Sequence, residues 1–294
     1  MRRNDFPNPM LDEITPLIIT HDEAPNIART LDKLGSARRI VVIDSGSTDD
    51  TARIARSYPQ VEVIAHPFID FASQCNFGLT QVTSPWVLSL DADYELTDDL
   101  VRELQALAPP LGIAGFRARF VYRIFGRALR GTLYPPRTVL YRREAARYRN
   151  EGHGHRVVVD GAVLDLRGAI YHDDRKPLAR WFASQQRYAR IEAEHLLALG
   201  RRARGTDRLR LMGWPAPIGV FFYTLLVKGC LLDGWAGWYY VLQRVIAEAL
   251  IALELADRRL RRRSQTADAA DSGAEPIAAP MPVRASIRAL GPQV

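Results

Sequence analysis

Two acidic side chains two positions apart, Asp91 and Asp93, follow an apolar run at residues 86–90 that we expect to be a strand. In an extended chain, side chains at i and i+2 point to the same side, so both carboxylates are expected to face one metal ion. Hard oxygen ligands select Mg²⁺ or Mn²⁺, and such ions bridge phosphate oxygens. Without a cation, two adjacent carboxylates repel each other. The pattern predicts a metal site for a phosphorylated ligand, and a solvated turn is the alternative.

A second polar cluster, Asp44-Ser45-Gly46-Ser47-Thr48-Asp49-Asp50, follows another apolar run at residues 40–43. In a parallel sheet, ligands bind at the carboxyl ends of the strands. At that end Asp44 can accept hydrogen bonds from a base or a ribose, and Gly46 allows the backbone close to a ligand. An ordinary turn is the alternative, because Ser, Thr and Asp are also the usual helix caps.

A third cluster, Glu151-Gly152-His153-Gly154-His155-Arg156, and His172 further on hold three of the six histidines. Near neutral pH, histidine can take up a proton or bind a metal as the neutral imidazole. Glu151 is an alternative base if burial raises its pKa. Two glycines beside two histidines suggest a flexible loop that closes over a substrate. We expect a catalytic base among Glu151, His153 and His155, with His153 favoured, and surface or structural histidines are the alternative.

The elements that must position these clusters alternate between strands and helices over the first 110 residues. Apolar runs that predict strands lie at residues 17–19, 40–43, 61–64 and 86–90, with helical patterns between them. This alternation is typical of a parallel sheet with helices on its faces. Further on, residues 157–159 and 162–164 flank Asp160-Gly161, which predicts a type I′ hairpin. We therefore expect an α/β fold with an antiparallel annex, followed by a helix at residues 177–199.

The most apolar part of the chain, residues 216–256, is expected to form C-terminal amphipathic helices. Its run of twelve uncharged residues is short of the about 20 that a membrane-spanning helix needs. Trp235 and Trp238 precede a basic run at residues 258–263, and aromatics beside a basic cluster are typical of helices in a membrane interface. A buried helical hairpin or a dimer surface is the alternative. From Ser264 on, a composition rich in Ala, Pro and Ser predicts a disordered tail.

The composition narrows the class of protein. Among 294 residues, 47% are hydrophobic and 25% charged, as in a globular chain. The net charge is +7, and all but three of the 40 basic residues are arginines, which suit phosphate on nucleotides or anionic lipids. We expect no nucleic-acid partner, because the basic residues do not alternate with stacking aromatics in a sheet. Two cysteines exclude a disulfide framework, and an N-terminus without an apolar stretch predicts a cytoplasmic location.

Four stretches in this order resemble glycosyltransferase family 2, at residues 15–27, 42–51, 76–79 and 90–93, and the resemblance extends over about residues 14–200. A shorter stretch, residues 229–237, is similar to the branch that builds lipopolysaccharide core and related surface glycans. The resemblance implies the A-type glycosyltransferase fold, which is Rossmann-like and mostly parallel. It also implies a nucleotide-sugar donor and inversion at the anomeric carbon.

The resemblance further implies roles for individual residues. Asp44 would bind the base, Asp91 would lie near the ribose and the metal, and His172 would lie near the diphosphate. The expected donor-binding residues are Thr20, His21, Glu23, Asp44, Gly46, Asn76 and Asp91. The expected ligands of Mg²⁺ or Mn²⁺ are Asp93, Asp91 and His172.

Two departures from the family pattern bear on the chemistry. Relatives often carry arginine where this chain has Cys75, so a phosphate contact is missing or comes from another arginine. The surface-glycan branch often reads His-Glu where this chain reads His153-Gly154-His155-Arg156. Which residue takes the acceptor proton is therefore open.

We predict an inverting, metal-dependent glycosyltransferase on the inner face of the cytoplasmic membrane, which transfers a sugar to a lipid-linked or membrane-bound glycan. The alternative is a catalytically weak or inactive membrane-docked scaffold that binds nucleotide-sugar. The expected division is a catalytic domain at residues 1–200, a helical membrane-associating region at 201–263 and a disordered tail at 264–294.

Overall fold

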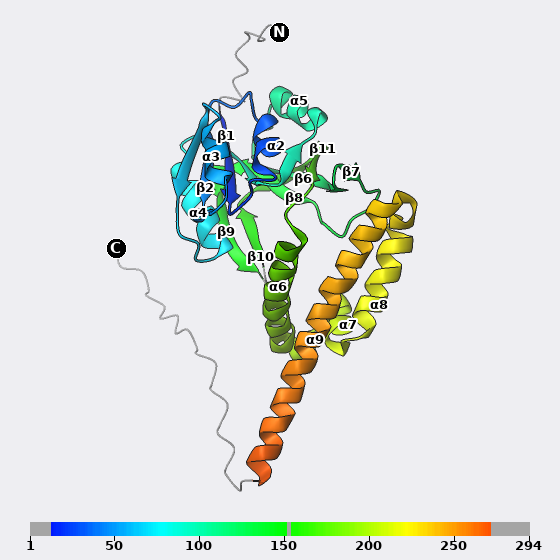
Figure 1. Cartoon of the computed structure of the whole chain (residues 1–294). Coiled ribbons are helices and arrows are strands. Elements are labelled where there is room, and N and C mark those ends of the chain that lie inside the picture. Colours follow the sequence, from blue (N-terminus) through cyan, green and yellow to red (C-terminus); the bar gives the residue numbers. More distant parts are fainter. Residues whose placement is uncertain (1–12, 152–153, 272–294) are drawn as a thin grey trace, which may run out of the picture.

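The computed structural model describes residues 13–151 and 154–271, without the side chains of residues 151, 154–155 and 266–271. Within that range the centre is a nine-stranded sheet (Figure 1). Eight of its strands lie in the order β3 (Val61–Ala65), β2 (Ile40–Asp44), β1 (Ile14–Thr20), β4 (Trp86–Asp91), β8 (Arg137–Arg142), β6 (Ile113–Ile124), β11 (Ala162–His172) and β5 (Tyr94–Leu96). The ninth, β7 (Arg127–Ala128), pairs with β6.

Strand direction divides this sheet into two halves. β3, β2, β1 and β4 are parallel to one another. β8 runs antiparallel to both β4 and β6, and β5 runs antiparallel to β11, whereas β6 and β11 are parallel. The helices α2 (Ile27–Asp32), α3 (Thr51–Arg56) and α4 (Phe71–Gln81) connect the parallel strands. A mixed, mostly parallel α/β sheet with C-terminal helices confirms the predicted fold class.

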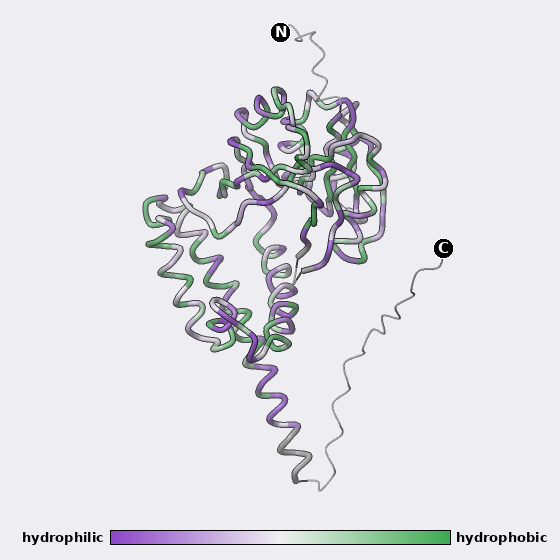
Figure 2. The backbone as a smooth tube through the Cα atoms, turned by 180° about the vertical axis from the view of Figure 1, so that it is seen from behind, coloured by the Kyte–Doolittle hydropathy of each residue, from purple (hydrophilic) through white to green (hydrophobic). Residues whose placement is uncertain are grey.

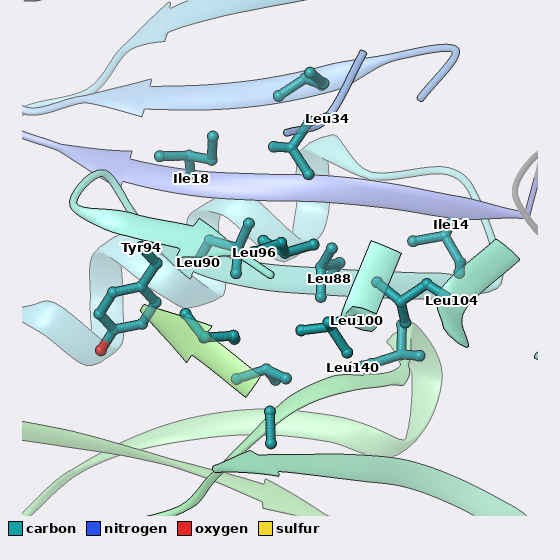
Figure 3. Close-up of a cluster of buried hydrophobic side chains, with 14 of the residues drawn as sticks. Ile14, Ile18, Leu34, Leu88, Leu90, Tyr94, Leu96, Leu100, Leu104 and Leu140 are labelled. Atoms are coloured by element: carbon teal, nitrogen blue, oxygen red, sulfur yellow. The ribbon is translucent and has the colours of Figure 1, made fainter. Parts of the chain in front are cut away.

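The core lies on both faces of the parallel strands. On one face, Ile14 and Ile18 of β1 pack beneath α2, α3 and α5 (Asp98–Ala106), and Figure 3 shows this cluster. On the other face, Leu17 of the same strand packs against Cys75 and Leu79 of α4. Strands covered on both faces are continuous apolar runs, which is why these runs were recognisable in the sequence.

The hairpin predicted around Asp160-Gly161 is wrong. Residues 157–159 belong to β10 (Gly154–Val159), which pairs antiparallel with β9 (Ala146–Glu151), whereas β11 begins at Ala162 in the large sheet. Gly161 has a φ of 129°, and a Cβ atom there would lie 2.7 Å from the Cβ atom of Ala114. At this glycine the chain passes from the small sheet to the large one. Glycine is needed there because the close approach to β6 leaves no room for a side chain.

Below the sheet lies a set of helices (Figure 1). α6 (Leu178–Leu199) and α7 (Gly205–Met212) lead to α8 (Pro215–Phe222). The turns η3 (Tyr223–Val227) and η4 (Cys230–Asp233) then connect α8 to α9 (Trp235–Asp271). A Cβ atom on Gly237 would lie 1.8 Å from the carbonyl oxygen of Cys230, so this glycine allows α9 to pack against the turn before it.

A third core cluster joins the α8–α9 hairpin to the sheet. Ile124 at the end of β6 and Leu129 pack against Leu225, Tyr240 and Val241 of the hairpin. The phenol oxygen of Tyr240 also accepts a hydrogen bond from the backbone N–H of Leu133 at 2.9 Å. The buried helical hairpin that was the alternative for this region is therefore part of the structure.

The end of α9 departs from the predicted division of the chain. The helix continues to Asp271, past the tail boundary predicted at Ser264, and the rest of that predicted tail lies outside the described residues. Figure 2 shows hydrophilic positions along the part of α9 that extends beyond the other helices. Over the described ranges, no helix is both long and apolar enough to cross a membrane.

Candidate active site

The register of the parallel strands brings polar residues of three strand ends together. Thr20 pairs with Asp44 across β1 and β2, and Ile19 pairs with Asp91 across β1 and β4. Thr20, Asp44 and Asp91 thus share the carboxyl edge of the sheet, where α/β folds bind ligands. The Thr20 hydroxyl is buried and has no hydrogen-bond partner among the residues described. This edge carries three of the predicted donor-binding residues.

Hydrogen bonds join the loops after β1 and β2 into one unit. The carboxylate of Asp22, whose φ is 51°, accepts a hydrogen bond from the backbone N–H of Thr48 at 2.6 Å. The backbone N–H of Glu23 donates to the Thr51 hydroxyl at 2.6 Å. Within the second loop, the Asp44 carboxylate accepts from the backbone N–H of Gly46 at 3.2 Å. These bonds hold Asp44 and Glu23 in fixed positions at the sheet edge.

His21 belongs to the same edge but faces outwards. Its side chain is 53% exposed, and its carbonyl oxygen accepts a hydrogen bond from the Arg180 guanidinium at 2.7 Å. Arg180 also donates to the carbonyl oxygen of Asp22, again at 2.7 Å. Because Arg180 lies in the first turn of α6, these bonds dock the start of that helix against the carboxyl edge of the sheet.

Asp93 and His172 meet although 79 positions separate them. β4 ends at Asp91, residues 92–93 form a turn, and β5 then places Tyr94 opposite His172 of β11. The Nε2 atom of His172 lies 3.1 Å from the Oδ2 atom of Asp93. The argument that Asp91 and Asp93 point the same way along an extended chain is therefore wrong, because Asp93 lies in a turn. It is pairing between β5 and β11 that brings Asp93 to His172.

Electrostatics tie both acidic residues to the same surroundings. Burial raises the pKa of Tyr94 above its usual range, and the charges of Asp91 and Asp93 raise it further. Burial would lower the pKa of Arg137, but neighbouring groups that include Asp91 and Asp93 hold it above its ordinary value. Both carboxylates therefore act on the same cluster of buried side chains, Tyr94 and Arg137. The rings of Tyr122 and Tyr134 also lie 4.7 and 4.9 Å from the His172 ring.

Lys176 is a cation at this site that the sequence analysis did not select. Its Nζ atom lies 2.6 Å from the Oε1 atom of Glu23 and 3.6 Å from the Oδ2 atom of Asp174. Burial opposes the charge of Lys176, yet Asp93, Glu23 and Asp174 together raise its pKa. The available signal was its rarity, because Lys176 is one of three lysines and lies four positions after His172.

The carboxylates around Lys176 differ in proton affinity. Burial and the charge of Asp93 raise the pKa of Glu23 to about 7, although Lys176 opposes this. Burial also acts to raise the pKa of Asp93, but His172 and Lys176 outweigh it and hold that pKa well below the usual range. His172 has a raised pKa because Asp93 outweighs the effect of burial. At neutral pH, Asp93 is therefore a carboxylate, whereas Glu23 titrates.

Asn76 and Cys75 both have structural roles in the fold. The Asn76 side chain accepts a hydrogen bond from the backbone N–H of Tyr148 at 2.9 Å and donates to its carbonyl oxygen at 3.1 Å. These two bonds fix β9 against α4, so the structure gives Asn76 a structural role and does not bring it into the acidic cluster. Cys75 is 1% exposed within the core. Lys176 and Arg137, and not position 75, bring positive charge to Asp91 and Asp93.

Two of the three predicted bases, Glu151 and His155, lie at the adjoining ends of β9 and β10. His153 lies outside the described residues, and only the backbone of Glu151 and His155 is described, in β9 and β10. Asn150 accepts a hydrogen bond from the backbone N–H of Ala72 in the first turn of α4 at 3.2 Å. Because α4 follows β3, its first turn lies at the carboxyl edge of the sheet. The backbone of Glu151 is therefore on the side of the sheet that carries Asp91.

The surroundings of Asp93 and His172 offer few protein ligands for a metal ion. Within the described parts of the chain, no three or more His, Cys, Asp or Glu side chains converge as a metal cluster. The Asp93–His172 pair fits such an ion in two respects: Asp93 is ionised, and the buried Nδ1 atom of His172 has no described hydrogen-bond partner to fix its tautomer. Mg²⁺ commonly binds through one or two carboxylates and completes its shell with water and substrate phosphates. The residues present fit an ion of that kind.

Acidic side chains and a histidine gathered at the carboxyl edge of a mostly parallel α/β sheet define a protein with a ligand site at that edge. The comparisons with known proteins then give the family. The model of glycosyl transferase family 2 matches residues 16–165. The chain belongs to glycosyltransferase family 2 and is a glycosyltransferase.

Individual relatives are more distant. The chain is 30% identical over 207 residues to the lipopolysaccharide core biosynthesis glycosyltransferase LpsC of Rhizobium meliloti, which covers 65% of this chain and 74% of that protein. It is 34% identical over 96 residues to an uncharacterized glycosyltransferase of Rickettsia felis, covering 32% of this chain and 34% of that protein. Among solved structures, glucosyl-3-phosphoglycerate synthase from Mycobacterium tuberculosis, in complex with Mn²⁺, UDP and phosphoglyceric acid, is similar at a TM-score of 0.43 and 18% identity, covering 68% of this chain and 84% of that one.

Proposed function

We propose that this glycosyltransferase moves a sugar from a nucleotide-sugar donor to a lipid-linked or membrane-bound glycan of the lipopolysaccharide or surface-polysaccharide type, with inversion. The observation that carries the proposal is the meeting of Asp44, Asp91, Asp93 and His172 at one edge of the sheet. The name of the Rhizobium relative supports the class of acceptor.

The donor would lie across the carboxyl edge of β2, β1 and β4. Asp44 would accept hydrogen bonds from the base or the ribose, and the unpartnered Thr20 hydroxyl offers a further polar contact there. His21, Glu23 and Gly46 border the same edge, so they complete the proposed nucleotide pocket. Asn76, which is bonded to Tyr148, supports this pocket only through β9.

Asp93 and His172, with Asp91, would hold Mg²⁺ or Mn²⁺ against the donor diphosphate. When bound, such an ion offsets the negative charge that builds on the departing nucleoside diphosphate. Lys176 and Arg137 place two further positive charges around the same carboxylates. In the transfer, the acceptor hydroxyl oxygen bonds to the anomeric carbon while the bond from that carbon to the diphosphate oxygen breaks. A single displacement of this kind inverts the configuration.

The acceptor proton would pass to a base in the segment from Glu151 to His155. Glu151, His153 and His155 remain the candidates, with His153 favoured. General-base assistance of this type contributes roughly 10²–10⁴-fold to a rate. The position of the Glu151 backbone on the Asp91 side of the sheet is compatible with that role.

We further propose that the α8–α9 hairpin docks on the anionic inner face of the cytoplasmic membrane. Large apolar side chains stay exposed along this hairpin and its turn, namely Trp214, Ile218, Phe222, Leu226, Val227, Leu232, Trp235 and Trp238, which we call the apolar face. A patch of this kind on one element marks an interaction site. Lys228 within the turn and the basic end of α9 favour an anionic surface.

A donor screen tests the transfer function directly. The full-length protein is incubated with UDP-, ADP- and GDP-sugars and MnCl₂, and free nucleotide is measured with and without glycolipids extracted from bacterial envelopes. We expect one donor to raise the melting temperature and to be consumed faster when the acceptor extract is present, because ligand binding stabilises the folded state. Donor binding by calorimetry without transfer to any extract would contradict the proposal and favour the scaffold.

A further inference from the structure

One asparagine at the start of α2 bonds both of the carboxylates that surround Lys176. Asn26 directly precedes α2 and is fully buried. Its Nδ2 atom donates to the Oε2 atom of Glu23 at 2.8 Å and to the Oδ1 atom of Asp174 at 3.3 Å. Glu23 belongs to the loop after β1, whereas Asp174 follows β11. The side chain of Asn26 therefore joins the two segments that meet at the lysine.

The oxygen of the same amide is also bonded. The Oδ1 atom of Asn26 accepts a hydrogen bond from the Arg29 guanidinium at 2.7 Å and another from the backbone N–H of Arg175 at 3.2 Å. An amide side chain has two N–H donors and one oxygen that accepts two bonds, so the hydrogen-bonding capacity of Asn26 is fully used. These four bonds fix the direction of the amide, with its N–H groups toward the carboxylates.

The backbone of the segment after β11 is anchored separately. The carboxylate of Asp173 is fully buried and accepts hydrogen bonds from the Arg29 guanidinium at 3.1 Å and from the backbone N–H of Gly126 at 2.9 Å. Arg29 also donates to the carbonyl oxygen of Asp173 at 2.7 Å. These bonds hold the chain between His172 and Asp174, and none of them involves the side chain of Lys176.

The ammonium group of Lys176 depends on its two carboxylate partners. A lysine side chain has a flexible four-carbon stem, so the position of its backbone does not place the Nζ atom. That atom lies 2.6 Å from the Oε1 atom of Glu23 and 3.6 Å from the Oδ2 atom of Asp174. Asn26 bonds the other oxygen of each carboxylate. One buried amide thus holds both of the groups that hold the ammonium.

We infer that Asn26 is a positioning residue for the transfer reaction, which acts through Glu23 and Asp174 to hold the ammonium group of Lys176 beside the donor diphosphate. The inference rests on the proposed function, in which Lys176 adds positive charge at that place. A residue that acts through Lys176 loses its effect on the donor once the lysine is removed. A residue that only stabilises the fold keeps its effect.

A double-mutant cycle on the full-length protein tests this difference. The KM for the donor is measured for the wild type, Asn26→Ser, Lys176→Met and the variant with both substitutions. Asn26→Ser should raise KM by about 3- to 10-fold, as loss of one hydrogen bond does. In the Lys176→Met background the same change should alter KM by less than about 2-fold, because residues that act as one unit are not additive.

The matched control is Asn76→Ser. Asn76 also bonds two groups through its side-chain amide, but these bonds fix β9 to α4. This substitution should change KM by the same factor with and without Lys176. Asn26→Thr, which is closer to asparagine in volume, replaces Asn26→Ser if circular dichroism shows that the serine variant is unfolded. Equal effects of the Asn26 substitution in both backgrounds, or no effect in either, would overturn the inference.

A second measurement needs no donor. The chain has three lysines, so NMR of isotopically labelled lysine side chains gives few signals, and the Lys176 signal is the one that Lys176→Met lacks. Hydrogen exchange between its Nζ–H groups and water should be at least about 5-fold faster in Asn26→Ser than in the wild type, because the ammonium loses its fixed partners. Asn76→Ser should leave this rate unchanged. An unchanged rate in Asn26→Ser would also overturn the inference.

The two measurements separate this inference from the function on which it rests. A wild-type protein that consumes no nucleotide-sugar contradicts the proposed function, and the exchange rates still decide whether Asn26 holds the lysine. A protein that consumes donor and needs Lys176, but in which Asn26→Ser leaves the exchange rate unchanged, contradicts only the role of Asn26.

Discussion

Two regions of the molecule are built on opposite principles. One is the carboxyl edge of β2, β1 and β4, which we call the donor edge, and the other is the apolar face of the α8–α9 hairpin. At the donor edge, the acidic groups are bonded to fixed partners: Asp22 and Asp44 accept backbone hydrogen bonds, Glu23 pairs with Lys176, and Asp93 pairs with His172. Along the hairpin, by contrast, large apolar side chains such as Trp214 and Val227 are 74% and 70% exposed. Chemistry on a diphosphate requires fixed positions, whereas contact with a fluid surface requires only apolar area and the correct charge.

The two regions should therefore respond differently to substitution. A single change at the donor edge removes a contact that neighbouring groups cannot replace, because they are committed to other bonds. A single change on the apolar face removes only a share of a summed area, so several changes are needed for a large effect. The predictions that follow use this difference, and each one pairs a substitution with a control substitution elsewhere in the chain.

The largest effect is expected at Asp93. Asp93→Asn keeps the shape of the side chain but removes the charge that pairs with His172, so donor turnover should fall by about 10²–10³-fold, as when one electrostatic contact to a transition state is lost. Turnover is measured at saturating MnCl₂. The control is Asp165→Asn, because Asp165 is 65% exposed and pairs with Arg117. Full turnover of Asp93→Asn would refute the proposed metal site.

The apolar face should account for membrane binding. We expect the triple variant Trp214→Ser, Phe222→Ser and Trp235→Ser to bind vesicles that contain phosphatidylglycerol about 100-fold more weakly. Each of these side chains is already partly buried, so on insertion it would contribute about 1 kcal/mol, a part of the roughly 1.5–3 kcal/mol for full burial. Vesicle co-sedimentation measures this, with phosphatidylcholine vesicles for comparison. Leu111→Ser, at a fully exposed leucine before β6, is the control. Unchanged sedimentation of the triple variant would refute the docking proposal.

Point substitutions test membrane docking more clearly than removal of the whole hairpin does. The hairpin also covers Ile124 and Leu129 of the sheet domain, so its deletion would expose part of the core. A truncated chain that leaves the membrane fraction could then be unfolded instead of released. Substitutions at the exposed positions of the apolar face reduce this ambiguity, because exposed side chains contribute less to stability than core residues do.

A smaller effect is expected at Lys176. Lys176→Met should raise the KM for the donor by about 10- to 100-fold, the range for a charge-assisted hydrogen bond to phosphate. Lys33→Met is the matched control, because Lys33 pairs with an exposed aspartate on the other side of α2. In Lys176→Met the buried Glu23 carboxylate loses its partner. A double variant that carries Lys176→Met and Glu23→Gln removes this unpaired charge. If the double variant keeps the wild-type KM, Lys176 does not contact the donor.

The smallest effect is a dependence of stability on pH. The pKa of Glu23 is about 7 in the folded protein, above its unfolded value of 4.5, so the folded state binds the extra proton between these values. The stability from Glu23 is present below pH 4.5 and is lost as the pH rises through 7. One proton corresponds to at most about 1.4 kcal/mol per pH unit. The raised pKa of His172 acts in the same direction.

Urea unfolding at several pH values, with EDTA present, measures this dependence. Glu23→Gln should flatten the decline of the unfolding free energy between pH 4.5 and 7. Glu62→Gln should leave it unchanged, because the Glu62 side chain is 53% exposed and paired with Arg39 at the surface. An identical pH profile for wild type and Glu23→Gln would contradict the raised pKa.

Sequence and structure agree best where a residue's position depends on its neighbours in the chain. Asp44 and Asp91 were found because each ends an apolar run, and parallel strands of matched length bring such ends to one edge. The fold class followed from the same alternation of strands and helices. The Asp160-Gly161 hairpin failed because residues 157–159 pair with β9, whereas residues 162–164 pair with β6, and a local turn pattern does not show which partner a strand takes.

The sequence by itself determined the family, the alternation of strands and helices over the first 110 residues, and which strand ends carry acidic groups, because these depend on patterns among neighbouring residues. Only the tertiary structure decided that Asp93 meets His172, that Lys176 meets Glu23 across 153 positions, and that one side of the α8–α9 hairpin is buried while the other stays exposed. Contacts of this kind depend on which strands pair and which faces pack, and that choice is made by the energy of the whole fold.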